Sequence, residues 1–193
     1  VLTLRGWPRW LASAAALAAL GLQTLRILPY TPLHPVEAAA TATCPEEDRL
    51  SLIVANLRAS NEGAGRFLAE VRHHDPDLVF VVEIDPGWAR ALTPLEAGYP
   101  HRLVHPRDDY WGLALYSRLP LEGAEVRHLL TGYVPSLRAG IRLPSSAVAA
   151  FHGLHPKPPL PGEGTGERDA ELLLTARAVR EEGGAAVVAG DLN

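Results

Sequence analysis

Short runs of hydrophobic residues recur along residues 49–193 and predict a protein built on β-strands. Residues 78–82 are apolar throughout, which predicts a strand that is buried on both faces. Residues 138–143 alternate between apolar and other side chains, which predicts a strand with one covered face. The other runs predict strands at residues 50–55, 113–116, 147–151 and 185–189.

Apolar residues at helical spacing predict three helices between these strands, at residues 62–74, 85–92 and 168–182. Asn61 or Ser60 is the expected N-cap of the first helix, and Gly183-Gly184 is a fitting stop for the last. Strands with helical crossovers, a hairpin-rich middle and a final helix and strand predict α and β layers around a mixed sheet.

An uncharged segment, residues 10–25, precedes the domain and predicts a membrane anchor at residues 1–28. A membrane-spanning helix needs about 20 apolar residues, and residues 10–25 alone are too few. The membrane segment must therefore extend over residues 10–28, with the charged end of the Arg26 side chain reaching the membrane surface. Arg5 and Arg9 before the segment predict a cytoplasmic N-terminus and a membrane-anchored domain on the extracytoplasmic side.

Two other interpretations of this segment stay open. It is also compatible with a signal peptide, with Ala-x-Ala triplets at residues 38–40 and 40–42, or with an Ala-rich amphipathic helix packed on the domain. Residues 29–48 hold four prolines and predict an extended linker, so the domain covers residues 49–193. Residues 153–167 are rich in Pro and Gly and predict a long loop, of the kind that is usually functional or disordered.

Composition and charge exclude several classes of protein. With 47% hydrophobic and 21% charged residues, the 193-residue chain is neither collagen-like, coiled-coil nor wholly disordered. The net charge is −4 overall and +3 over residues 1–36, which leaves −7 on the rest and excludes a chain-wide basic surface for nucleic acid. The single cysteine, Cys44, excludes an internal disulfide and a cysteine-rich zinc module. A local basic patch remains an expectation, from Arg102, Arg107, Arg118, Arg127, Arg138 and Arg142.

Polar side chains follow several of the expected strands. Asn56 follows the first, Glu83 the second, His152 and His155 a later one, and Asp191 and Asn193 the last. Each has an ordinary explanation as a turn, cap or loop residue. Taken together they are more informative, because rigid strand ends bring groups from distant sequence to one place.

This set of side chains suits hydrolysis of a phosphate ester. Carboxylate and amide oxygens are hard ligands for Mg²⁺, which keeps several waters and needs few protein groups. The metal neutralises charge on the phosphoryl and leaving oxygens, while a second carboxylate orients or activates the attacking water. Imidazole and amide groups donate hydrogen bonds to the remaining phosphoryl oxygens as charge accumulates.

The same residues resemble the endonuclease/exonuclease/phosphatase superfamily. The matching segments occur in the family's order: LSLIVANL, DPDLVFVVEI, YWGLALYSRLPL, FHGLHPKPP and GDLN. The apolar N-terminal segment is similar to that of a membrane-anchored bacterial branch. The resemblance implies an α/β (α+β) fold, a four-layer α/β/β/α sandwich of two mixed sheets with helices outside.

The resemblance also implies a role for each site residue. Glu83 would be the principal Mg²⁺ ligand with Asn56 beside it, and Mn²⁺ is an alternative ion. Asp191 would position or activate the water, and Asn193 and His155 would contact the scissile phosphate. His155 is preferred over His152 because its His-Pro pair matches the family's loop.

In one respect this sequence departs from the family pattern. The family has a further Asp-His pair near its C-terminus, and no such pair follows Asn193 here. The resemblance therefore implies that the C-terminal part of the fold is missing, that a sheet edge is open, and that this 193-residue chain has weak or no activity. A longer natural product would then be the hydrolase.

Substrate and class stay open at this point. A phosphate ester of nucleic acid, or of a lipid or small-molecule headgroup, is compatible with the set. The alternative is a non-catalytic, membrane-tethered interaction module with the same fold. A third reading makes His152 and His155 zinc ligands, although their spacing lies on a strand and loop rather than a helix.

Overall fold

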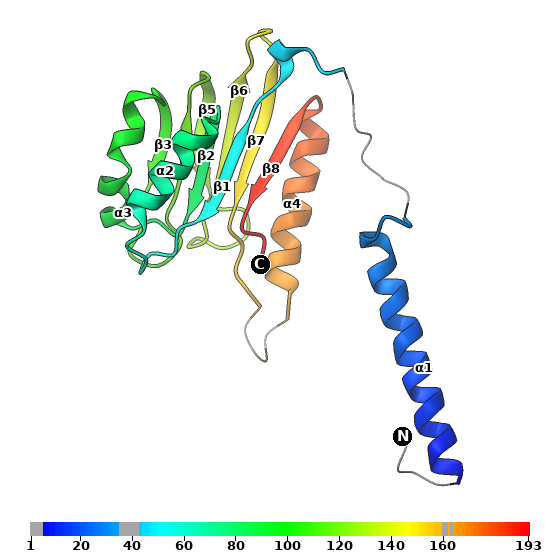
Figure 1. The fold of residues 1–193 in the computed structure, drawn as a ribbon. Coiled ribbons are helices and arrows are strands. Elements are labelled where there is room, and N and C mark those ends of the chain that lie inside the picture. The colour runs from blue at the N-terminus through cyan, green and yellow to red at the C-terminus, as the bar shows by residue number, and fades with distance from the viewer. Residues whose placement is uncertain (1–5, 35–42, 160–161, 163) are drawn as a thin grey trace. The chain divides into compact units, whose positions relative to one another are not determined.

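The computed structural model describes residues 6–34, 43–159, 162 and 164–193 (Figure 1). Contacts divide the chain into two units, residues 1–43 and residues 44–193, and each is described here by itself. The Ala-x-Ala triplets at residues 38–42, and part of the expected linker, lie outside the described residues.

The first unit holds the helix α1 (Trp7–Ile27), which continues into a short 3-10 turn at Leu28–Tyr30. None of the residues of α1 is buried. The most apolar 18-residue window of the segment Trp7–Tyr30 has a mean hydropathy of 1.6. It is thus one helix that is long and apolar enough to cross a membrane.

The second unit is built on two mixed sheets of four strands each. In the first sheet the order is β1-β2-β4-β3, with β1 parallel to β2 and β4 antiparallel to both β2 and β3. In the second the order is β5-β6-β7-β8, antiparallel except for the parallel pair β7 and β8. The bounds are β1 Leu52–Asn56, β2 Leu78–Val82, β3 His101–His105, β4 Leu113–Ser117, β5 Leu121–Arg127, β6 Ser136–Arg142, β7 Val148–Leu154 and β8 Ala186–Gly190.

The core between the sheets fixes how they face each other. Side chains on one face of β2 and β4 pack against side chains from β6 and β7. At the centre the rings of Phe80 and Phe151 meet edge to face, 5.4 Å between centroids. A Cβ at Gly153 would lie 2.5 Å from the Phe80 ring, so only glycine lets β7 approach so closely.

Helices cover the outer faces of both sheets, which gives the four layers that the family resemblance implies (Figure 1). The helices α2 (Ala64–His74) and α3 (Pro86–Ala91) pack on the first sheet, where Val71 and Trp88 contact the face of β2 opposite Phe80. The helix α4 (Gly166–Glu182) packs against the second sheet. All five residues of β2 are therefore buried, as their unbroken apolar run predicts.

Two strands are absent from the sequence prediction, β3 and β5. Both lie at sheet edges, and polar residues or glycine interrupt their apolar residues, so neither shows an apolar run. The pairing of β5 with β6 also shifts register between Glu122 and Glu125, near Gly123 at φ +56°.

The expected N-cap of the first domain helix is wrong. The helix α2 begins at Ala64 with Gly63 as its N-cap, and that cap makes no side-chain hydrogen bond. The side chain of Asn61 instead accepts a hydrogen bond from the Gly63 N–H at 3.0 Å and forms a turn before the helix.

A buried acid on α4 makes stability depend on pH. Glu171 is 4% exposed, and its Oε1 accepts no hydrogen bond from any described residue. Burial, together with the charge of Glu167, raises the pKa of Glu171 from 4.5 to about 7. Between these values the unfolded chain has lost a proton that the folded protein keeps, so stability falls as the pH rises through this window.

We expect Glu171→Gln to raise the free energy of unfolding at pH 8 by up to about 3 kcal/mol, and to change it little at pH 4. Urea denaturation at the two pH values measures the difference. Glu181→Gln, an exposed change on the same helix, is the control. An equal effect of Glu171→Gln at both pH values would show that Glu171 does not carry the penalty.

Candidate active site

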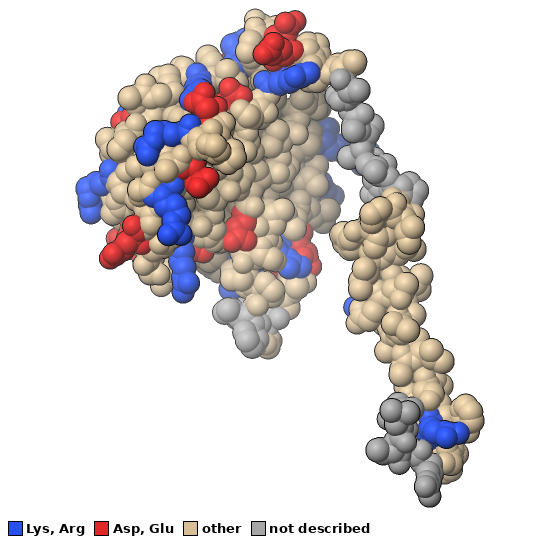
Figure 2. Space-filling view, viewed as in Figure 1, with Lys and Arg blue, Asp and Glu red and all other residues tan. Residues whose placement is uncertain are grey.

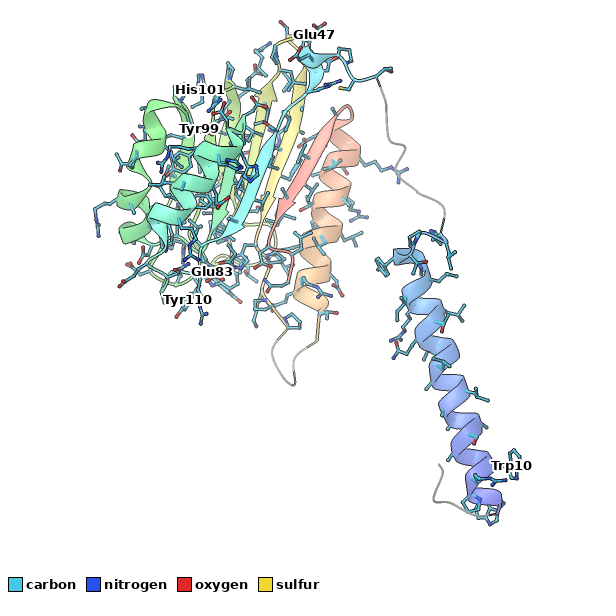
Figure 3. The ribbon with its side chains drawn as sticks, in the orientation of Figure 1. Trp10, Glu47, Glu83, Tyr99, His101 and Tyr110 are labelled. Atoms are coloured by element: carbon cyan, nitrogen blue, oxygen red, sulfur yellow. The ribbon has the colours of Figure 1, made fainter. Side chains whose placement is uncertain are left out.

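Both sheets deliver polar side chains to the same end of the sandwich. Asn56 ends β1 and Glu83 follows the parallel strand β2, with Asn56 paired in register with Val82. His155 follows β7 and Asp191 follows the parallel strand β8, with Leu154 paired with Gly190. Figure 3 shows Glu83 at this end of the domain, opposite the end that carries Glu47 and His101.

The amide of Asn56 joins the two sheets at this end. Its Nδ2 donates a hydrogen bond to Glu83 Oε1 at 2.7 Å and another to Asp191 Oδ2 at 2.8 Å. Its Oδ1 accepts a hydrogen bond from the Arg58 N–H at 2.9 Å, which fixes which way the amide points. The structure thus brings together three of the residues that the sequence singles out.

His155 lies against the same carboxylates. It is 6% exposed, and its Nε2 is 3.8 Å from Glu83 Oε1. Burial lowers the pKa of His155 below its usual value, and the negative charges of Asp191 and Glu83 oppose this only in part. The ring is therefore neutral near pH 7, with one N–H to donate.

Asn193 is connected to the site by hydrogen bonds to three other residues. Its backbone N–H donates to Asp191 Oδ1 at 3.2 Å, and its Nδ2 donates to the carbonyl of Pro156 at 2.8 Å. Its own carbonyl accepts a hydrogen bond from Arg168 Nη1 at 2.6 Å. The last residue is thus tied to the loop that carries His155 and to the start of α4.

The backbone at Glu83 is strained and closely held. Glu83 has φ +58°, a left-handed conformation that a non-glycine residue rarely adopts away from functional sites. The next residue is held on both sides: the Ile84 N–H donates to Gly112 O at 3.2 Å, and the Arg107 N–H donates to Ile84 O at 3.0 Å. A Cβ at Gly112 would lie 1.8 Å from Ile84 O, so glycine is required there.

A second close approach places Asp191. Gly190 has φ +147°, and a Cβ there would lie 1.8 Å from Leu154 O. Only glycine allows the ends of β7 and β8 to come so near. The residues that follow, His155 and Asp191, are thereby kept side by side.

Hydrogen bonding to Asn56 holds the pKa of Asp191 below its usual range. Partial burial opposes this shift, while the backbone N–H of Asn193 reinforces it. Asp191 is therefore ionised at neutral pH and free to accept a proton or a hydrogen bond.

His152 has different partners from His155. It lies inside β7, since that strand runs to Leu154, and its Nε2 is 3.3 Å from Glu182 Oε2. Glu182 Oε1 also accepts a hydrogen bond from Arg138 Nε at 2.7 Å, so His152 belongs to the contact between α4 and the second sheet.

Within the described ranges, no group of three or more His, Cys, Asp or Glu side chains gathers closely enough to hold a metal ion.

The local basic patch expected from six arginines does not form, because each arginine is paired with an acid. Figure 2 shows basic and acidic side chains interspersed on the viewed face of the domain. The pairs are Arg102–Glu96, Arg107–Asp109, Arg118–Asp75, Arg127–Glu125, Arg138–Glu182 and Arg142–Glu122.

Sequence reasoning missed one residue at the site, Trp111. Its ring lies 5.1 Å from the ring of His155, at 49°, and 6.3 Å from the ring of Tyr133. Trp111 directly precedes Gly112. Glycine is required at that position because of a close backbone contact, which the sequence alone does not show.

Comparisons with known proteins identify the family and support the fold. Residues 53–193 match the family model described as the Endonuclease/Exonuclease/phosphatase family. Among solved structures, D. rerio TDP2 complexed with single strand DNA product is 20% identical, with a TM-score of 0.64 over 75% of this chain and 60% of that one. An endonuclease/exonuclease/phosphatase from Beutenbergia cavernae DSM 12333 is 22% identical, with a TM-score of 0.60 over 75% of this chain and 47% of that one.

At these identities the structural similarity establishes the fold, and this chain spans about half to three-fifths of the length of the two proteins. A search of curated proteins gave no match.

The link through Asn56 can be tested by titration. We expect Asn56→Ala to raise the pKa of Asp191, because the largest cause of its lowering is removed. Carbon-13 NMR of the aspartate carboxyl groups measures the change. Asn61→Ala, which removes an amide from a turn outside these contacts, is the control. An unchanged Asp191 titration in Asn56→Ala would contradict the assigned link.

Proposed function

Since the chain belongs to the endonuclease/exonuclease/phosphatase family, we propose that its domain is a Mg²⁺-dependent hydrolase of phosphate esters, of the phosphodiesterase or nuclease type. The observation that carries the proposal is the Asn56 amide bound to both Glu83 and Asp191. Two carboxylates held within reach of one amide concentrate negative charge at a point that a divalent cation would neutralise.

The donor set fits such an ion. Members of this family generally depend on a divalent metal. Glu83 offers a carboxylate that is 18% exposed. The Asn56 amide turns its Nδ2 to Glu83 and its Oδ1 to the Arg58 N–H, so Asn56 would become the second ligand by turning its amide oxygen toward the ion. Mg²⁺ needs only one or two such protein groups because it retains water, and Mn²⁺ would bind the same ligands.

The metal, when bound, would polarise a phosphoryl oxygen and stabilise the leaving oxygen. Asp191 is kept ionised by Asn56, so it orients the attacking water and accepts its proton. His155 is neutral and donates an N–H to a phosphoryl oxygen as charge develops there. Asn193 lies at the rim of the same end and contacts the phosphate next to His155.

Nucleic acid is the substrate class that the comparisons favour, because one similar structure is described as a complex with a single strand DNA product. A lipid or small-molecule headgroup presents the same phosphate ester chemistry. The two are separated by comparing hydrolysis of an oligonucleotide with hydrolysis of a phospholipid headgroup.

We expect Glu83→Gln to abolish Mn²⁺ binding and to lower Mg²⁺-dependent phosphodiester hydrolysis by the protein at least 100-fold, since a neutral amide replaces the principal ligand. Electron paramagnetic resonance measures bound Mn²⁺, and product release from an oligonucleotide measures hydrolysis. Glu47→Gln is the matched control, because Glu47 lies at the opposite end of the domain (Figure 3).

Mn²⁺ affinity that is the same in the parent and in Glu83→Gln would exclude the proposed metal site. The domain would then be a non-catalytic interaction module with this fold. Metal binding that depends on Glu83 without hydrolysis of any phosphate ester by the protein would exclude the hydrolase.

We further propose that α1 anchors the protein in a membrane through residues 10–28, with the domain on the extracytoplasmic side because of Arg5 and Arg9. Charges at the centre of a spanning helix cost about 2.5–3.5 kcal/mol each. We therefore expect the double change Leu17→Lys and Leu20→Lys to release the protein from membranes in a carbonate extraction. A parent protein that carbonate already releases would contradict the anchor.

A further inference from the structure

We propose that Trp111, with Tyr133 beside it, is an aromatic platform that receives an unpaired nucleobase next to the scissile phosphate. The proposal rests on the proposed function and narrows its substrate to single-stranded nucleic acid. Trp111 is thus a specificity-determining residue, distinct from the side chains that hold the metal and the water.

The platform adjoins the reacting groups directly. The Trp111 ring is 5.1 Å from the His155 ring, and His155 Nε2 is 3.8 Å from Glu83 Oε1. Trp111 and Tyr133 meet edge to face at 66°, with 6.3 Å between centroids. A base stacked on the indole would therefore lie beside the side chains that are proposed to act on its phosphate.

The backbone next to Trp111 is held by the same contacts that hold the backbone next to Glu83. Gly112, the next residue, is locked against Ile84 by a hydrogen bond and by an approach that excludes any Cβ. Arg107 and Asp109, which precede Trp111 in the loop, are joined by an ion pair. A platform that is ordered before binding loses little conformational entropy when a base stacks on it.

These rings are not part of the hydrophobic core. Trp88 is 4% exposed and packs between α3 and the first sheet, whereas Trp111 is partly exposed and Tyr133 is 44% exposed. Tyr110, 60% exposed, lies toward the same end of the domain as Glu83 (Figure 3). Large rings left open to solvent beside reacting groups mark a binding surface.

The charge of the domain favours stacking over phosphate contacts as the source of affinity. The six arginines of the middle third are all paired with acids, and residues 37–193 carry −7. Binding of duplex DNA depends on many unneutralised cations along its backbone. Base–aromatic stacking is worth about 1–3 kcal/mol per base and requires a base that is not paired.

Binding measured apart from cleavage tests the platform. The 193-residue chain carrying Glu83→Gln, kept in detergent because α1 is exposed and apolar, is titrated into a fluorescent oligothymidylate and followed by anisotropy. An oligonucleotide of the same length without bases presents the same phosphates and no rings. We expect the protein to bind oligothymidylate more tightly than the abasic strand or a duplex.

We expect Trp111→Ala to weaken binding of oligothymidylate about 5- to 150-fold, and to leave binding of the abasic strand unchanged. Trp111→Phe keeps a ring and most of the affinity, whereas Trp111→Leu keeps apolar volume and loses the affinity. This comparison remains decisive if the alanine variant folds poorly. Trp10→Ala, which removes an exposed indole from the other unit, is the matched control and should change nothing.

The proposal is contradicted if Trp111→Leu binds oligothymidylate as tightly as Trp111→Phe does. It is also contradicted if the protein with Trp111 binds the abasic strand as tightly as oligothymidylate, or binds no oligonucleotide. Failure of the hydrolase itself appears elsewhere, as metal binding or hydrolysis that does not depend on Glu83. The two proposals therefore fail in different experiments.

Discussion

The site depends on how two separately built sheets bring their strand ends to one point. Phe80 of the first sheet packs edge to face on Phe151 of the second, over a glycine that leaves no room for a side chain. Because protein interiors are close-packed, this contact sets the relative position of the sheets to within a small fraction of a side chain. Only with the sheets so placed can one amide, that of Asn56, reach carboxylates on both.

The same end of the domain combines strain with tight packing. Glu83 adopts a left-handed backbone, and Gly112 and Gly190 allow main chains to meet where any Cβ would collide. Such geometry costs free energy, and it persists only when the surrounding structure determines it fully. Here the buried strand β2 and the core on both of its faces provide that support, and the result is a set of polar groups with little freedom to move.

Much of this arrangement can be predicted from the sequence, and some of it cannot. The unbroken apolar run of β2 predicts a buried strand, and the resemblance to a known family implies the fold. The polar residues at the strand ends are the ones that meet at one edge of the sandwich. The edge strands β3 and β5 lack a hydrophobic period, because solvent or charge pairing satisfies most of their side chains. The contact between Trp111 and His155 joins residues far apart in sequence, so only the packed sheets disclose it.

Most of the ion pairs made by the six arginines of the middle third could likewise not be predicted from the sequence. Four of these arginines pair with an acid on another element or turn, and the other two, Arg107 and Arg127, pair with an acid two residues away. The central claim is that Glu83, Asn56 and Asp191 surround a single divalent ion. The most direct test is anomalous diffraction from crystals soaked in Mn²⁺. The account predicts one strong peak within coordination distance, about 2.0–2.2 Å, of the Glu83 carboxylate and facing Asp191; a peak elsewhere, with none at Glu83, would contradict it.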